Sequence, residues 1–315
     1  MEYSGLIQKY KINRPLTQEE KQLQLKQKKK IHANPDYLFA TIKVNGTYLE
    51  LADKYYGERG WLTMGMGLVS CVCSWAIAMF GFGSLAAIMN PDSLANKMEI
   101  HIVVAFAMLV LSFLLAFAIW GLRKEAFFLT HFPARLNRKT RMVHVFRPDR
   151  SGSILSVPWN DVFFTIGRGQ TLQYRDIRGH VLDKDGVTVL ETFTLGTSWV
   201  DCEALTNHWE YMRRYMEEGP QAIVERTLLY LPIADKKETW AFALRRLYLL
   251  MPTYVAMTLY TPFYLFLLPF RMFANATSKI PQWSADIEAQ CTIEPNDPYV
   301  RDESFNKYNR WGWPI

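Results

Sequence analysis

Two long apolar stretches constrain this chain more than any other feature of its sequence. Residues 61–89 and 102–122 contain no Asp, Glu, Lys or Arg over 29 and 21 residues, and only twelve residues separate them. A helix needs about 20 apolar residues to cross the roughly 30 Å hydrocarbon core of a bilayer. The two stretches therefore predict a transmembrane helical hairpin over residues 61–122, and the chain is expected to be an integral membrane protein.

A third apolar stretch, residues 247–270, has 24 residues without a charge, but three prolines interrupt it. Proline removes a helical hydrogen bond and kinks a helix, so two interpretations stay open. The segment either crosses the membrane once, as we expect, or is re-entrant and returns to its starting side. Its Thr and Tyr side chains also give it a polar, aromatic stripe that fits the lining of a pore in an oligomer.

The distribution of Lys and Arg predicts the orientation of the hairpin, because positively charged flanks stay in the cytoplasm. Residues 1–60 contain eleven Lys and Arg and residues 123–246 contain nineteen, whereas the connector 90–101 contains one. We therefore expect the N-terminus and the middle region to be cytoplasmic. The side on which the C-terminal tail lies depends on the path of the third apolar stretch.

Residues 1–60 predict a cytoplasmic helix and a small β-hairpin. Thr17 and Glu20 form a capping box, and the charged, Gln-rich run after them predicts a solvated helix to about Ile31. Asn45-Gly46 is the strongest short signal for a hairpin turn. The extended segments expected to flank this turn are residues 37–44 and 47–51.

Residues 123–220 predict a cytoplasmic antiparallel β domain that one helix closes. Short apolar or alternating segments recur at the regular spacing of a sandwich or barrel. The strands expected are residues 126–130, 141–147, 153–157, 162–166, 172–177 and 188–195. Apolar residues then recur at steps of three and four, and Gly219-Pro220 follows them, which predicts a helix over residues 201–218.

The C-terminal third is expected to contain an amphipathic helical linker at residues 221–246, the third apolar segment, and a polar, aromatic tail at residues 271–315. Aromatic rings that are not buried in their own protein often mark contacts with partners. The candidate partner contacts in this tail are Tyr299, Tyr308, Trp311 and Trp313. The whole chain is therefore predicted to be a membrane α+β protein.

Parts of the chain resemble known bacterial proteins. The strands and helix of residues 123–220, placed directly after a membrane hairpin, resemble the pleckstrin-homology-like (PH-like) domains of bacterial membrane proteins. Four local sequences resemble an uncharacterised family of proteobacterial inner-membrane proteins whose members are often encoded beside type VI secretion components and their toxins. They are residues 133–141 (PARLNRKTR), 143–147 (VHVFR), 157–162 (VPWNDV) and 296–302 (NDPYVRD). The resemblance implies a multi-pass protein of the inner membrane, and it brings no site residues.

The sequence offers no arrangement that is typical of an active site. Its six histidines do not fall at metal-ligand spacing, and Gly167-Arg168-Gly169 lacks the lysine of a phosphate-binding loop. A Gly-x-Ser-x-Gly elbow is also absent from the sequence. We therefore expect no catalytic residues, no cofactor and no metal, and we predict that the protein is not an enzyme.

A binding protein at the inner membrane is the function that these features favour. With the resemblance, the prediction is an immunity or accessory protein that binds a type VI secretion toxin or a secretion component. The net charge of +6 does not require nucleic acid, because much of the excess flanks the spans. The lysines of residues 26–30 can contact anionic membrane lipid, although positive charge that fixes the topology explains them equally well. The alternative function is a pore-forming membrane effector or channel-like homo-oligomer.

Overall fold

The computed structural model describes residues 3–4, 9–89, 98–147, 153–169, 173–249, 251 and 253–308. The chain divides into two compact units, which we call the β unit and the helical unit. The β unit comprises Met1–Glu58, Leu129–Leu249 and Lys279–Ile315, and the helical unit comprises Arg59–Phe128 and Leu250–Ser278. Each unit is therefore assembled from segments that lie far apart in the sequence.

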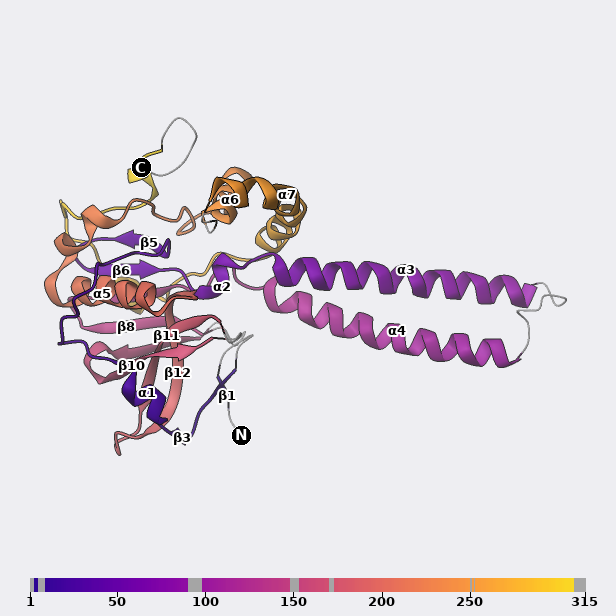
Figure 1. Cartoon of the computed structure of the whole chain (residues 1–315), viewed down its shortest axis with the longest axis horizontal. Helices are drawn as coiled ribbons and strands as arrows, with labels where there is room; N and C mark the ends of the chain where they lie inside the picture. The colour runs from indigo at the N-terminus through magenta and orange to yellow at the C-terminus, as the bar shows by residue number, and fades with distance from the viewer. Residues whose placement is uncertain are drawn as a thin grey trace. The chain divides into compact units, whose positions relative to one another are not determined.

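Two five-stranded antiparallel sheets form the frame of the β unit (Figure 1). The first sheet has the order β5 (Thr41–Val44), β6 (Tyr48–Leu51), β7 (Ala134–Asn137), β8 (Met142–Phe146) and β9 (Ile154–Pro158). The second sheet has the order β3 (Arg14–Pro15), β12 (Thr188–Trp199), β11 (Arg175–Leu182), β10 (Val162–Arg168) and β4 (Gln24–Leu25). A separate pair joins β1 (Tyr3–Ser4) to β2 (Tyr10–Lys11).

The helix α5 (Cys202–Glu218) contributes a row of buried side chains to the core of the β unit. It begins after Asp201, whose carboxylate accepts hydrogen bonds from the first turn, and it ends at Gly219, as the sequence predicts. Trp209 on this helix stacks on Trp159, with 5.4 Å between ring centroids, and also meets Phe164 at 4.8 Å. The apolar stripe of α5 is therefore a core face.

The N-terminal sixty residues join both sheets instead of forming the helix and hairpin alone. The capping box of Thr17 and Glu20 is present, but α1 (Gln18–Gln22) ends well before Ile31. The chain instead becomes strand β4, whose Leu25 pairs with β10 and is buried in the core. Burial of an apolar side chain and strand pairing outweigh the helix propensity of the charged run.

The predicted hairpin around Asn45-Gly46 is present as β5 and β6, but the first extended segment, expected from residue 37, begins only at Thr41 because a turn precedes it. The Asn45 side chain closes the turn, because its oxygen accepts hydrogen bonds from the backbone N–H groups of Thr47 and Tyr48, each at 2.8 Å. Such local bonds explain why a short polar sequence specifies a turn.

Several predicted elements of the middle region need correction. The strand expected at residues 126–130 is wrong, because only Leu129 forms an isolated bridge, and its partner is Lys279. The strand expected at residues 172–177 starts at Arg175, and Leu172 lies outside the described residues. Strand β7 was not predicted, because its four residues alternate apolar with Arg135 and Asn137 and are too few to give a periodic signal.

The helical linker expected at residues 221–246 is also wrong over most of its length. Two short 3-10 turns, η3 (Pro220–Ala222) and η4 (Val224–Arg226), are followed by extended chain, and α6 (Trp240–Tyr248) begins only after Thr239. Leu229, Tyr230, Leu231 and Ile233 all enter the core, and the Leu231 N–H donates to the Thr41 carbonyl at 2.8 Å. Burial of successive side chains and the backbone bond to β5 hold this segment in the core without a helix.

Among its described residues, the helical unit contains three helices that are long and apolar enough to span a membrane: α3 (Trp61–Met89), α4 (Met98–Glu125) and α7 (Tyr254–Thr277). The helices α3 and α4 lie side by side along their length (Figure 1). Small residues allow this close approach, since a side chain at Gly121 would lie 2.8 Å from Met66. The helix α7 starts seven residues later than the predicted 247–270 segment, after the N-cap of Thr253, and contains Pro262 and Pro269.

Candidate functional site

A row of polar side chains crosses one face of the first sheet, and we call it the polar ladder. Its members occupy consecutive cross-strand positions from β5 to β9. They are Lys43, Glu50, Arg135, His144 and Ser156. Neighbouring positions on the same strands carry apolar residues such as Leu136 and Val143, which enter the core. Because side chains alternate between the two faces of a sheet, the polar ladder lies on the face away from the core.

A segment near the C-terminus covers this polar face, and we call residues 279–301 the strap. The strap contains α8 (Ala285–Gln290), and its Ile287 and Cys291 pack with Tyr48 of β6. Polar bonds fix it further, since the amide of Asn137 donates to the Gln290 carbonyl at 2.8 Å. At its end, Arg301 and Val44 exchange backbone hydrogen bonds of 2.8 and 2.9 Å, which extends the sheet beyond β5.

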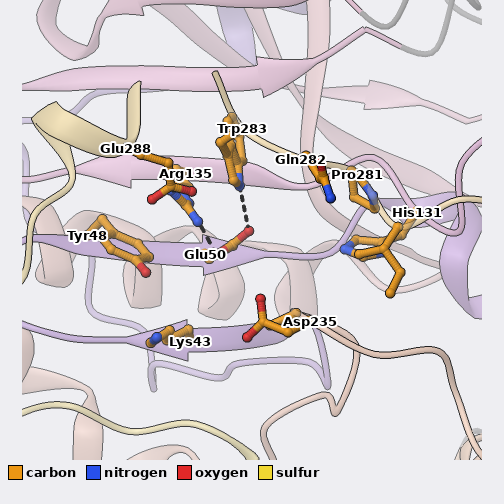
Figure 2. Close-up of a pocket in the computed structure, with 12 residues that line it drawn as sticks. Lys43, Tyr48, Glu50, His131, Arg135, Asp235, Pro281, Gln282, Trp283 and Glu288 are labelled. Carbon is orange, nitrogen blue, oxygen red and sulfur yellow. Dashed lines mark hydrogen bonds and ion pairs between the residues drawn. The ribbon is translucent and has the colours of Figure 1, made fainter. Parts of the chain in front are cut away.

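Arg135 is the centre of the site (Figure 2). Its Nε donates to Glu50 at 3.2 Å, and its Nη1 donates to Glu288 of the strap at 3.0 Å. The guanidinium also lies over the rings of Tyr48 and Trp283, at 4.5 and 4.7 Å from their centroids. Trp283 completes the group, because its Nε1 donates to the second oxygen of Glu50 at 3.0 Å. The polar ladder and the strap are thus joined through one buried guanidinium.

The charges of this group depend on one another. Burial raises the pKa of Glu50, while Arg135 and the hydrogen bond from Trp283 act against that rise. Burial is the largest single influence on the pKa of Arg135 and acts to lower it, but the attractions of Glu50, Tyr48, Glu288 and Cys291 together raise the value. Arg135 therefore stays protonated and is the main charge that favours ionised Glu50.

A pocket of about 360 Å³ opens beside the Glu50–Arg135 pair. Its lining residues are Lys43, Tyr48, Glu50, His131, Arg135, Ala234, Asp235, Ile280, Pro281, Gln282, Trp283 and Glu288. Figure 2 shows Lys43 and Asp235 across the pocket from the Trp283 side chain. Both charge signs line the pocket, and the arrangement is suited to ion pairing and aromatic stacking. Among the residues that the structure describes, no group of three or more His, Cys, Asp or Glu is placed to hold a metal ion.

His144 is the member of the polar ladder next to Arg135, and we expect it to make the protein less stable in acid. Burial and the nearby Arg135 lower its pKa to about 4. The unfolded chain binds a proton near pH 6.5, so stability is full above that pH and falls as the pH drops toward 4. We expect His144→Gln to remove about 2–3 kcal/mol of this acid destabilisation, measured by chemical denaturation between pH 7 and 4. His32→Gln, at an exposed position, is the control, and an equal effect of both variants would contradict the prediction.

The comparison with known proteins bears on this same region. Residues 111–295 match the model of a family of unknown function, DUF6708, and the match covers more than half of the 315-residue chain. The chain belongs to this family. The matched residues include Arg135, His144, Ser156 and most of the strap, whereas Lys43 and Glu50 precede them. No curated protein and no solved structure matches the chain.

The residues that the sequence suggested as partner contacts do not line the pocket. Tyr299 is half-buried in the strap, where its N–H donates to the Asp297 carboxylate at 2.9 Å. Tyr308 is partly exposed, and the Arg245 guanidinium lies 4.9 Å from the centre of its ring. Trp311 and Trp313 lie outside the described residues.

Sequence reasoning missed the pocket residues, although one signal pointed to their region. The four local sequences quoted above lie in β7, in β8, across β9 to β10, and in the strap. Asp297 of the last sequence accepts a hydrogen bond from the Gly46 N–H at 2.5 Å, so this motif reaches the β5–β6 turn. The shared location appears only when the strands are placed in register.

The strand β9 forms an open edge of the first sheet. The backbone N–H of Arg147 donates to the Ser153 carbonyl, and the backbone N–H of Trp159 donates to the Arg141 carbonyl. These two bonds determine which residue pairs of β8 and β9 are hydrogen-bonded and which are not. By this alternation, the backbone groups of Ile154 and Ser156 point away from β8. Within the described part of the chain, no further strand pairs with β9 on that side. An edge of this kind can accept an extended segment of another protein.

Proposed function

We propose that this protein is a non-enzymatic membrane-anchored binding protein, and that it serves as an immunity or accessory protein for a type VI secretion toxin. In this proposal α3 and α4 anchor the chain, and the β unit recognises the partner. An immunity protein of this kind neutralises its toxin by covering the active region with a rigid, complementary surface.

The open edge of β9 is the observation that carries the binding function. Among the residues that the structure describes, no strand pairs with the outward backbone N–H and C=O groups of Ile154 and Ser156. Strand addition at such an edge supplies main-chain hydrogen bonds, and adjacent side chains supply specificity. The Ser156 side chain is exposed and held by His144 at 2.8 Å, so this part of the edge is ordered before a partner arrives.

The ion pairs of the polar ladder support the same proposal. The buried charges of the polar ladder are bonded to one another and to the strap, which gives the sheet behind β9 a fixed shape. A rigid surface loses little conformational freedom on binding, and this favours tight association.

The cellular setting is also part of the proposal. The excess of Lys and Arg in residues 1–60 and 123–246 supports an inner-membrane protein whose β unit faces the cytoplasm. The resemblance of the local sequences supports the link to type VI secretion. Antiparallel strands followed by α5 support a PH-like origin for the middle region.

Capture of partners from native membranes tests the proposal. We expect full-length tagged protein to recover one secretion-associated toxin in a stable proportion, identified by mass spectrometry. Ser156→Pro removes the outward N–H without touching the bonds to β8, and we expect it to reduce toxin recovery at least tenfold. Ser156→Ala is the matched control, because it removes the hydroxyl bond to His144 and keeps the N–H.

Each outcome has a defined meaning, provided that both variants purify from membranes in the amount of the parent protein. Equal toxin recovery with Ser156→Pro and Ser156→Ala would show that the β9 edge is not the contact. Recovery of the protein alone, as a homo-oligomer, would contradict the immunity or accessory function and favour a pore-forming effector.

A further inference from the structure

Both ends of α7 lead into the same folded unit. Residues 129–249 before it and residues 279–308 after it are joined by backbone pairing, since the Thr130 N–H donates to the Lys279 carbonyl at 2.8 Å. The Tyr230 N–H likewise donates to the Asn306 side chain at 2.7 Å. A single folded unit cannot occupy both sides of a bilayer. A helix between two of its segments therefore leaves and returns on one side, whatever its length.

The contacts of α7 with the hairpin stay at one end of α3. Phe263 lies 5.0 Å from Trp61 between ring centroids, and a side chain added at Gly60 would lie 2.8 Å from Arg271. A side chain added at Gly67 would likewise lie 3.6 Å from the Phe270 ring. Phe270 and Arg271 are adjacent on α7, yet their partners Gly67 and Gly60 lie seven residues apart, about 10 Å at about 1.5 Å per residue. Parallel or antiparallel neighbours would shift in step, so α7 crosses the hairpin instead of running beside it.

Figure 1 agrees with these contacts. The helices α3 and α4 extend lengthwise across the view, while α7 is seen nearly along its axis at the end where α3 begins. The three helices belong to one compact unit, so this crossing is a property of the unit itself.

A polar cluster fixes the crossing. Arg59 donates to the Ala274 carbonyl at 2.8 Å and to the Ser278 hydroxyl at 2.6 Å, both at the end of α7. The same guanidinium donates to the backbone carbonyl of Glu125 at the end of α4, at 2.9 Å. The Glu125 carboxylate accepts from the Thr63 N–H at 2.7 Å, near the start of α3. Charged groups of this kind collect at the membrane boundary, where the helix ends meet water.

The uncovered surface of α7 is apolar. Its large exposed side chains include Val255, Leu259, Leu265, Phe266 and Phe273. Residues 254–270 carry no charge, and the first charged residue of the helix, Arg271, is fully buried. The exposed apolar surface of α3 and α4, which we expect the bilayer to cover, begins beside it at Trp61. Lipid is therefore the occupant that is continuous with the neighbouring surface.

We propose that α7 is an in-plane membrane helix that lies in the lipid–water interface at the base of the α3–α4 hairpin. Its exposed apolar side chains contact the boundary between head groups and acyl chains, and both of its flanks lie on one side of the membrane. This topology differs from the single crossing that the sequence favours. It also places the strap on the same side as residues 129–249.

Depth measurement along α7 tests the proposal. Single cysteines at Val255, Leu259, Phe266 and Phe273, in a background without the four native cysteines, would carry the fluorophore NBD in phosphatidylethanolamine–phosphatidylglycerol vesicles. We expect all four sites to show the same ratio of quenching by head-group and deep-chain nitroxide lipids. Matched sites on α3 are Val72, Met79 and Ile88, which are also exposed, and their ratio is expected to vary severalfold with depth.

The other results would overturn the proposal. A depth that passes from one interface through the midplane between Val255 and Phe273 would show a crossing helix. Quenching at the α3 sites with none at the α7 sites would show that protein, such as a second copy of the chain, covers the face.

Labelling from the two membrane sides gives an independent measurement. Ser284→Cys in the strap and Lys184→Cys in the turn between β11 and β12 are both at exposed positions, and Glu99→Cys is exposed at the other end of the hairpin. We expect a membrane-impermeant maleimide to label the first two from the same side of oriented vesicles and Glu99→Cys from the opposite side. Labelling of Ser284→Cys together with Glu99→Cys would exclude an in-plane α7.

Discussion

Arg135→Met is expected to lower the free energy of unfolding by about 3–5 kcal/mol, because it leaves Glu50 buried without its main counter-charge. The variant also loses the bond from Arg135 to Glu288 and the contacts of the guanidinium with the rings of Tyr48 and Trp283. Chemical denaturation in detergent, followed by tryptophan fluorescence, measures the change. Trp283 reports on the site directly, since it donates to Glu50.

The loss in Arg135→Met is expected to depend on pH in a defined direction. Burial raises the pKa of Glu50, and removal of Arg135 raises it further. A carboxyl whose pKa is higher in the folded state loses stability as the pH rises above its unfolded value near 4.3. The destabilisation is therefore expected to be smaller at pH 5 than at pH 8.

Two further variants distinguish this effect from general damage. Glu50→Gln added to Arg135→Met removes the uncompensated charge and keeps an acceptor for Trp283, so it is expected to recover most of the loss. Arg168→Met is the matched control, because its ion pair with Glu19 is exposed and is expected to contribute less than about 1 kcal/mol. A loss of several kcal/mol in the double variant would contradict the charge argument.

Trp209→Ala is expected to destabilise the β unit by about 3–5 kcal/mol. Trp209 is fully buried, stacks on Trp159 and contacts Phe164, so its removal leaves a large cavity where α5 meets the strands. Its ring N–H has no hydrogen-bond partner among the described residues, so the loss comes from packing and apolar burial alone. The same denaturation experiment measures the loss.

Trp240→Ala is the matched control for this variant. The Trp240 side chain is 55% exposed at the start of α6, so its removal creates no cavity and is expected to cost less than about 1 kcal/mol. Similar losses in both variants would show that the Trp159–Trp209 stack is not a main support of the fold.

Several parts of the fold could be predicted from the sequence, because their signals are local. The helices α3 and α4 follow from continuous apolar runs, and α5 follows from apolar spacing and its stop at Gly219-Pro220. The β5–β6 turn follows from Asn45-Gly46, whose own side chain closes it. In each case the residues that specify the element are the residues that form it.

The parts that could not be predicted depend on partners distant in sequence. Residues after Gln22 form β4 because β10 pairs with them, and residues 229–233 are not helical because they enter a core built by other segments. The short strand β7 is likewise recognised only between β6 and β8. Local propensity is weaker than these tertiary interactions.

The candidate site was missed for the same reason. Glu50, Arg135 and Trp283 are separated by 85 and 148 positions, and only strand register and the path of the strap bring them together. The sequence alone determined a hairpin of two helices that are long and apolar enough to span a membrane, and strands followed by one helix in the middle region, because contiguous hydrophobicity and periodicity are properties of a single segment. Only the tertiary structure decided the polar ladder, the strap over it and the single folded unit that joins both flanks of α7, because each depends on contacts between segments that lie far apart in the sequence.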